Sequence, residues 1–150
     1  YANGQYNYNQ GYPQGPYVDG NNMYIECKAY QPTPTPNDYI NLVSPILGDN
    51  TAWADPSGES GGRLYISSAR KAGLKIYGAN KYPGSIKDGI SIIKKYKLHL
   101  VDSKEMRKEQ SSYCRAKAKV NGVMITTDDP IDSDNHIWDA VRMTCLSNRL

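Results

Sequence analysis

An α/β fold with a mixed central sheet flanked by helices is the fold class that the sequence predicts. Two runs of strand-favouring residues come early and flank Asp19-Gly20-Asn21, a typical hairpin turn. After residue 50, short apolar runs alternate with segments of helical periodicity. Alternating strands and helices indicate parallel strand pairs, and the early hairpin adds an antiparallel pair. The 150 residues suffice for one hydrophobic core, so we expect a single domain over 1–150.

The first half of the chain is expected to begin with a loop or a polar strand over 1–16, which carries no charge and is rich in Tyr, Asn, Gln and Gly. After the hairpin and a Pro-rich loop, residues 39–47 favour a helix that is capped by Asn37 or Asp38 and cut by Pro45. A short buried strand then ends on Asp55.

A Gly-rich turn and a helix follow that strand, and Gly73 is expected to close the helix. The remaining order is a strand at 74–79, a helix that starts near Ser85, a strand at 98–102, a polar helix at 103–117, a turn at Asn121-Gly122 with a loop, and a helix at 136–146. The helix that starts near Ser85 is expected to bury Ile86, Ile90 and Ile93 on one face. The helix at 136–146 is expected to bury Ile137, Val141 and Cys145.

Several classes of protein are excluded or disfavoured. No apolar run approaches the roughly 20 residues of a membrane helix. No GxxxxGK[ST] or GxGxxG motif is present, so a P-loop ATPase is excluded. The only histidines, His99 and His136, exclude a multi-His zinc site. Three cysteines far apart (Cys27, Cys114 and Cys145) indicate buried thiols in a reducing compartment.

Basic residues cluster in the middle of the chain, although the net charge is only +3. Between residues 63 and 97 only Asp88 opposes them. The block consists of Arg63, Arg70, Lys71, Lys75, Lys81, Lys87, Lys94, Lys95 and Lys97. Such a block is typical of a surface that binds a phosphate backbone and equally of a solvated helix face.

Two aspartates are candidate functional residues. Asp55 follows a predicted strand, at the end where open α/β sheets bind ligands, and it is either a catalytic or metal-binding carboxylate or a helix cap. Asp139 shares a helix face with His136, and its carboxylate either has a functional role or interacts with the helix dipole. Together they resemble half of a two-metal site, which needs three or four carboxylates.

Four segments occur in an order that is similar to a known family. They are "TAWADPSGES", "KAGLKIYGANKYPGSIKDGISIIKKYKLHL", "KEQSSY" with Glu109 four residues before Tyr113, and "PIDSDNHIWDAVRM". The chain resembles, from about Thr51 to Met143, the C-terminal nuclease domain of tailed-phage terminase large subunits. The combination of "GSIKDGI" with "NHIWDAVR" is what makes the resemblance specific.

The resemblance implies an RNase H-like fold and an endonuclease, dependent on Mg²⁺ or Mn²⁺, that cuts concatemeric viral DNA during genome packaging. It matches Asp55 and Asp139 to family catalytic and metal-binding residues, with Asn135 and His136 beside the site. Lys81, Lys94, Lys95 and Lys97 would hold the DNA backbone. Implied partners are double-stranded DNA, an ATPase domain absent from this chain, the small terminase subunit and the portal, in the host cytoplasm and away from membranes.

The first strand departs from the family pattern. The position of the family's first catalytic Asp falls near Asn3, and no acidic residue precedes Asp19. Either Asn has replaced the Asp, or the strand aligns differently, or the domain is impaired. Among the nearby acidic residues, Asp129, Asp132 and Asp134 are possible substitutes, and Asp134 is the candidate third metal ligand. The alternative to an active nuclease is therefore an impaired RNase H-like module that binds DNA or docks onto the motor.

Overall fold

The computed structural model describes residues 16–57, 62–113, 115–130 and 135–148, and within these ranges the fold is mixed α/β. Strand β1 (Tyr17–Asp19) pairs antiparallel with β2 (Asn22–Ile25), which pairs parallel with β5 (Lys97–Leu100). The expected class and the mixed sheet are confirmed. The sheet is smaller than expected, because β3 (Thr51–Ala54) and β4 (Lys75–Gly78) form a separate parallel pair.

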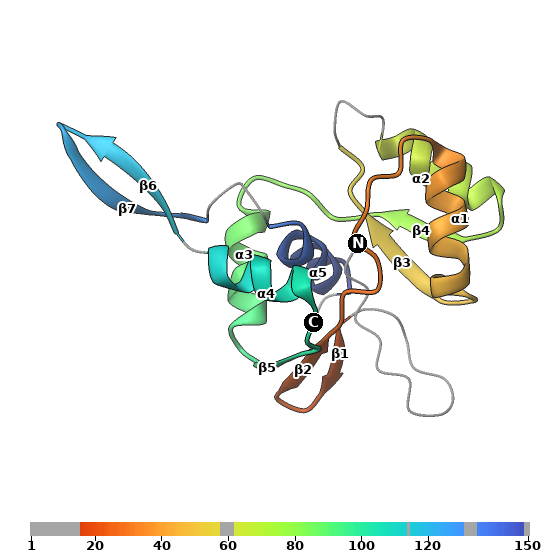
Figure 1. Cartoon of the computed structure of the whole chain (residues 1–150), viewed down its shortest axis with the longest axis horizontal. Coiled ribbons are helices and arrows are strands. Elements are labelled where there is room, and N and C mark those ends of the chain that lie inside the picture. Colours follow the sequence, from red (N-terminus) through yellow and green to blue (C-terminus); the bar gives the residue numbers. More distant parts are fainter. Residues whose placement is uncertain (1–15, 58–61, 114, 131–134, 149–150) are drawn as a thin grey trace.

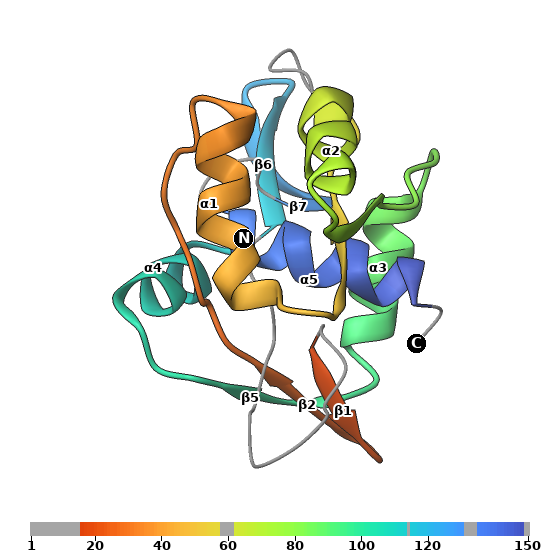
Figure 2. The same ribbon diagram turned by 90° about the vertical axis from the view of Figure 1, so that its right-hand side faces the viewer.

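Helix α5 (His136–Ser147) runs through the middle of the molecule (Figure 2). On one side of it lie α1 (Pro36–Leu47), α2 (Gly62–Lys71), β3 and β4, and on the other side lie the three-stranded sheet, α3 (Ser85–Ile93) and α4 (Lys104–Ser112) (Figure 1). The predicted buried stripe of α5 is confirmed, since Ile137, Val141 and Cys145 are fully buried.

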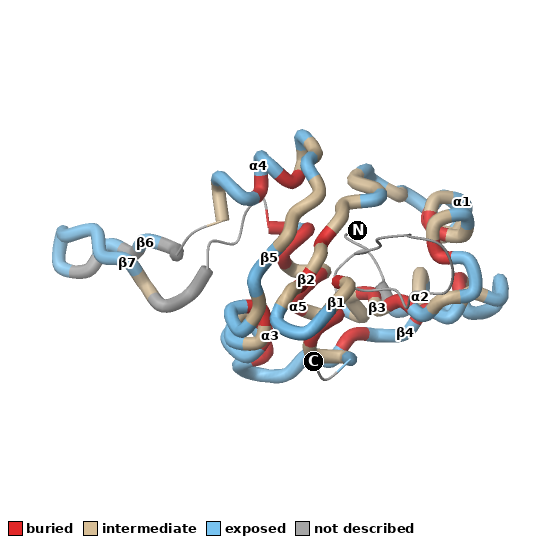
Figure 3. The backbone as a smooth tube through the Cα atoms, turned by 90° about the horizontal axis from the view of Figure 1, so that it is seen from below, coloured by how far each residue is buried: buried red, intermediate tan, exposed pale blue. Residues whose placement is uncertain are grey.

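Two hydrophobic clusters stabilise the fold. One joins β2, α3, α4 and α5 and contains Met23, Ile25, Ile93, Met106, Ile137, Trp138, Val141 and Cys145. The other joins α1, β3, α2 and β4 and contains Tyr39, Val43, Leu47, Ala52, Ala54, Ala69 and Ile76. Figure 3 shows buried segments along α5 and in β3. We call the first of these clusters the α5 cluster and the second the β3 cluster.

Helix α1 begins and ends differently from the prediction. Thr35, rather than Asn37 or Asp38, is the N-cap: its hydroxyl accepts a hydrogen bond from the Asp38 N–H at 3.2 Å, and the Asp38 carboxylate accepts one from the Thr35 N–H at 3.1 Å. This reciprocal capping box satisfies two N–H groups at once. The helix continues through Pro45 to Leu47, although Pro45 has no N–H to donate to the carbonyl four residues earlier.

The buried face of α3 also differs from the prediction. Ile93 is buried as predicted, but Ser85 and Gly89 are the other buried residues, whereas Ile90 is half-buried and Ile86 is 43% exposed. Gly84, with a positive φ of 93°, precedes the helix as its N-cap in place of Ser85. Helix α3 turns Gly89 inward because the helix packs closely against α5, where the Arg142 side chain occupies the space that a larger residue at position 89 would fill.

A two-stranded hairpin replaces the end of the predicted polar helix and the loop after it. Helix α4 ends at Ser112, and β6 (Arg115–Val120) pairs with β7 (Val123–Pro130). Asn121 and Gly122 both have positive φ, as the expected turn requires. The hairpin projects from the body beside α3 (Figure 1), and near its tip Val123 is 63% exposed.

Two of the three cysteines lie in the described residues, and both are free thiols. Cys145 is fully buried, and burial raises the pKa of its thiol to about 12, whereas Cys27 is half-buried. Cys114 lies outside the described residues. The described part of the chain contains no helix with the length and apolar character that a membrane span requires.

Candidate functional site

Asp55 lies directly after β3, as the sequence predicts. Ala52 and Ala54 are buried on one face of that strand, and the chain leaves it at Asp55. The Asp55 carboxylate accepts hydrogen bonds from the Ser57 N–H at 2.8 Å and from the Ser57 hydroxyl at 2.7 Å. This local turn fixes the carboxylate at the carboxyl end of a parallel strand pair, where open sheets bind ligands.

Lys81 holds the same carboxylate from the neighbouring strand. It lies three residues after β4, and the hydrogen bond from the Ala79 N–H to the Ala54 carbonyl (2.8 Å) keeps the two strand ends together. Its ammonium nitrogen lies 3.0 Å from both Asp55 carboxylate oxygens and 2.7 Å from the Ser57 hydroxyl oxygen. Lys81 therefore bonds the proposed catalytic carboxylate, a contact that the sequence does not reveal.

The Asp55 carboxyl group is charged at neutral pH. Partial burial is the largest single influence and raises its pKa, but the hydrogen bonds from Ser57 and the Lys81 ammonium together outweigh burial and lower the pKa below its usual value. The carboxylate therefore carries the negative charge that a cation ligand needs, and in this structure the Lys81 ammonium is the cation that it binds.

Asp139 lies in the first turn of α5 and is 30% exposed. Its N–H donates to the Asn135 carbonyl at 2.8 Å, so the helix fixes its backbone. Its carboxylate accepts a 2.5 Å hydrogen bond from the Arg142 guanidinium, which is only 7% exposed. A buried guanidinium with one charged partner places this carboxylate firmly on the α5 surface.

Gly89 provides the space for Arg142. A Cβ at Gly89 would lie 2.0 Å from Arg142 Cγ and 2.9 Å from its Cδ. The two most specific sequence segments, "GSIKDGI" and "NHIWDAVR", therefore meet at this contact. The glycine of the first segment determines how the arginine of the second reaches Asp139.

Glu109 is a buried residue that sequence reasoning noted only as part of the family resemblance. It is fully buried on α4, and its carboxylate accepts a 2.7 Å hydrogen bond from the Ile137 N–H in the first turn of α5. Beside it Tyr113 stacks on Trp138 with ring centroids 5.6 Å apart. The sequence signal was available: Glu109 shares its helix face with Met106 and Tyr113, an unusual place for a carboxylate.

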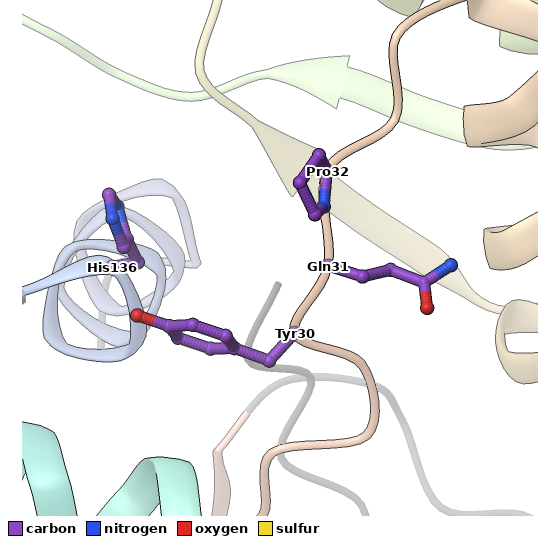
Figure 4. Close-up of a pocket in the computed structure, with 4 residues that line it drawn as sticks. All are labelled: Tyr30, Gln31, Pro32 and His136. Carbon is purple, nitrogen blue, oxygen red and sulfur yellow. The ribbon is translucent and has the colours of Figure 1, made fainter.

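A pocket of about 470 Å³ lies beside the start of α5. Tyr30, Gln31, Pro32 and His136 line it, and in Figure 4 Tyr30 reaches across from the β2–α1 connection towards the helix. The rings of Tyr30 and His136 meet edge to face at 5.9 Å. His136 and the buried Asn135 thus lie at the α5 start, as expected, with His136 facing this pocket.

The two aspartates are each paired with a cation of this chain. Within the described ranges, no group of three His, Cys, Asp or Glu side chains is placed to hold a metal ion. Asn3, Asp132 and Asp134, which the sequence analysis considered as further ligands, lie outside those ranges, as does the side chain of Asp129. Carboxylate oxygens such as those of Asp55 and Asp139 are the donors that Mg²⁺ or Mn²⁺ prefers, and Mg²⁺ sites commonly use one or two carboxylates, although Lys81 here occupies both oxygens of Asp55.

The predicted DNA-binding lysines lie on the surface. Lys94 and Lys95 follow α3, Lys97 begins β5, and all three are exposed, as is the rest of the basic block from Arg63 onwards. Lys81 is exposed too but bonds Asp55.

Comparisons of the chain with protein-family models, curated proteins and solved structures found no match.

Proposed function

We propose that this chain is a metal-dependent DNA endonuclease with an RNase H-like fold, of the kind found in the terminase large subunits that it resembles. Its substrate is concatemeric double-stranded viral DNA. One observation carries the proposal: Asp55, whose carboxyl group is charged at neutral pH, lies at the carboxyl end of a parallel strand pair, and both of its oxygens bond the Lys81 ammonium.

Asp55 and Asp139 are the residues that would hold Mg²⁺ or Mn²⁺. The chemistry that such an ion supplies is activation of water and stabilisation of the oxygen that leaves the phosphodiester. The exposed Lys94, Lys95 and Lys97 bind the DNA backbone without reading its sequence. Cleavage is therefore expected to be weakly sequence-specific.

The family resemblance extends the proposal to partners. The nuclease would act with an ATPase domain, a small terminase subunit and a portal in the cytoplasm of an infected cell.

Plasmid cleavage tests this function. We expect nicking or cutting in Mn²⁺ or Mg²⁺, none in EDTA, and a loss of more than about 100-fold in Asp55→Asn and Asp139→Asn, since even residues that only support a metal ligand contribute about 10- to 100-fold. Asp49→Asn, an exposed aspartate in the α1–β3 turn, is the matched control. Full metal-dependent cutting by Asp55→Asn would overturn the proposal.

The alternative is an impaired module of the same fold that binds DNA or docks onto the motor. Two observations favour it: no acidic residue precedes Asp19, although the family's first Asp would fall near Asn3, and the Asp139 carboxylate is paired with the buried Arg142. This alternative predicts DNA binding without cleavage in any metal. Cleavage restored by Asn3→Asp would then identify the missing carboxylate.

A further inference from the structure

All the donors of the Lys81 ammonium are engaged on its own protein. An ammonium group has three N–H donors, and three acceptor atoms surround this one: two Asp55 carboxylate oxygens at 3.0 Å and the Ser57 hydroxyl oxygen at 2.7 Å. In this arrangement Lys81 has no donor left for a DNA phosphate, although the sequence places it in the basic block. By contrast, Lys75 at the start of β4 bonds the neutral Asp49 carbonyl at 2.9 Å.

The Lys81–Asp55 pair can separate at low cost. Lys81 is 40% exposed and Asp55 is 41% exposed, so water reaches both groups. Exposed ion pairs contribute only about 0 to 1 kcal/mol. The backbone of Lys81 is held close to the end of β4, but its side chain is long and flexible. The ammonium can therefore leave the carboxylate without a change in the backbone.

A divalent cation on Asp55 would compete with Lys81 for the same two oxygens. Like charges at such short separation repel each other, even near the protein surface. Occupation of Asp55 by a divalent ion therefore requires the ammonium to move away. The released ammonium lies beside the site where a scissile phosphate must bind, and it then has donors to offer that phosphate.

We propose that Lys81 is an exchangeable counter-ion that neutralises Asp55 in the metal-free protein and moves to a DNA phosphate when a divalent cation takes its place. This inference rests on the proposed function, because it assigns the metal to Asp55. It makes Lys81 a positioning residue that couples metal binding to DNA binding. By thermodynamic linkage, DNA must strengthen metal binding by the factor by which metal strengthens DNA binding.

Metal binding without DNA provides the first test. Titration of Mn²⁺ into DNA-free protein, followed by calorimetry, should show that Lys81→Met binds Mn²⁺ roughly two- to fivefold more tightly than wild type, because no ammonium competes. Lys81→Arg should stay near wild type, and Lys75→Met should not change the Mn²⁺ affinity. If Lys81 served only to hold the strand ends together, Lys81→Met would weaken Mn²⁺ binding, which would overturn the proposal.

DNA binding without metal provides the second test. In EDTA, Asp55→Asn should release Lys81, so that the salt dependence of binding to a short labelled duplex becomes steeper by about one unit in the log–log slope, the value of one phosphate contact. The double variant Asp55→Asn/Lys81→Met should return to the wild-type slope. In the wild-type background Lys81→Met should leave the log–log slope unchanged. Lys75→Met should change that slope by the same amount in the wild-type and Asp55→Asn backgrounds.

The outcomes separate the two proposals. Metal-dependent cleavage by wild type, with an unchanged Mn²⁺ affinity and an unchanged salt slope in these variants, would overturn the exchange and leave the nuclease standing. Wild-type protein that neither binds Mn²⁺ nor cuts DNA would overturn both. Unfolding curves for each variant confirm that the comparison is between folded proteins.

Discussion

At Gly89 the absence of a side chain is required by the packing of Arg142. In an ordinary helix Gly→Ala stabilises by about 1 kcal/mol. Here the added methyl would overlap the Arg142 side chain, which is nearly buried. We therefore expect Gly89→Ala to destabilise the protein by about 1 to 3 kcal/mol, the range for overpacked sites. Urea unfolding measures this change.

The exposed Ser91 on the same helix is the matched control. Ser91→Ala should leave the free energy of unfolding within about 0.5 kcal/mol of wild type. A Gly89→Ala variant as stable as Ser91→Ala would mean that Arg142 can move aside freely.

Asp55 should contribute to the pH dependence of stability. Its pKa is lower in the folded protein than the usual value of 3.8. A group with a depressed pKa stabilises the folded state above the unfolded pKa, and this contribution is lost as the pH falls through the folded pKa. Unfolding measured from pH 6 down to about 3 should therefore show a smaller loss of stability in Asp55→Asn than in wild type. Parallel curves for the two proteins would show that the ion pair with Lys81 contributes nothing.

At the scale of elements, Glu109 links α4 to the first turn of α5. Its carboxylate bonds the Ile137 N–H, one of the N–H groups that a helix start leaves unpaired. We expect Glu109→Ala to lower the free energy of unfolding by about 1 to 3 kcal/mol. Glu109→Gln keeps an acceptor and should lose less. The exposed Gln110 supplies the control variant Gln110→Ala, and equal effects at the two positions would contradict the capping role.

Local chemistry explains which elements the sequence predicts. The hairpin at Asp19-Gly20, the strand before Asp55, the helix end at Gly73 and the stripe of α5 depend on neighbouring residues, and the structure confirms them. On α3, Ile93 is buried as predicted, but the rest of the buried face was predicted wrongly because it depends on Arg142, more than fifty residues further on. The β6–β7 hairpin was missed because its lysines alternate with alanines and weaken the strand signal.

The candidate site shows the same division. Asp55 and Asp139 lie at a strand end and a helix start, as their local sequence predicts. Lys81 was assigned to DNA, and its bond to Asp55 appears only when β3 and β4 pair. Spacing alone cannot tell which cation reaches which carboxylate, because the pairing of distant strands decides it.

The whole molecule consists of two hydrophobic clusters joined along α5. The described contacts between them include the hydrogen bond from Trp53 Nε1 to Asn148 Oδ1 at 2.9 Å and that from the Asn80 N–H to Ser147 Oγ at 3.1 Å. Such polar contacts resist separation less than apolar packing does. The two clusters are therefore expected to open with different free energies.

Hydrogen exchange tests this expectation. Ile76 is fully buried in the β3 cluster, and Ile76→Ala should cost about 2 to 5 kcal/mol there. Exchange should accelerate in α1, α2, β3 and β4 more than in α5. Val141→Ala, in the α5 cluster, should produce the opposite pattern. Uniform acceleration in both variants would show one cooperative unit.

The β6–β7 hairpin has a practical consequence. Among the strands that the structure describes, its two strands pair only with each other, with Arg115 opposite Pro130, and its turn at Asn121 and Gly122 is exposed. Exposed loop tips are the sites at which inserted sequences are tolerated best. A fluorescent protein or an affinity tag placed between Asn121 and Gly122 would be held away from Asp55 and from both clusters. This turn is therefore a suitable attachment point for a label that reports on the protein without disturbing its core.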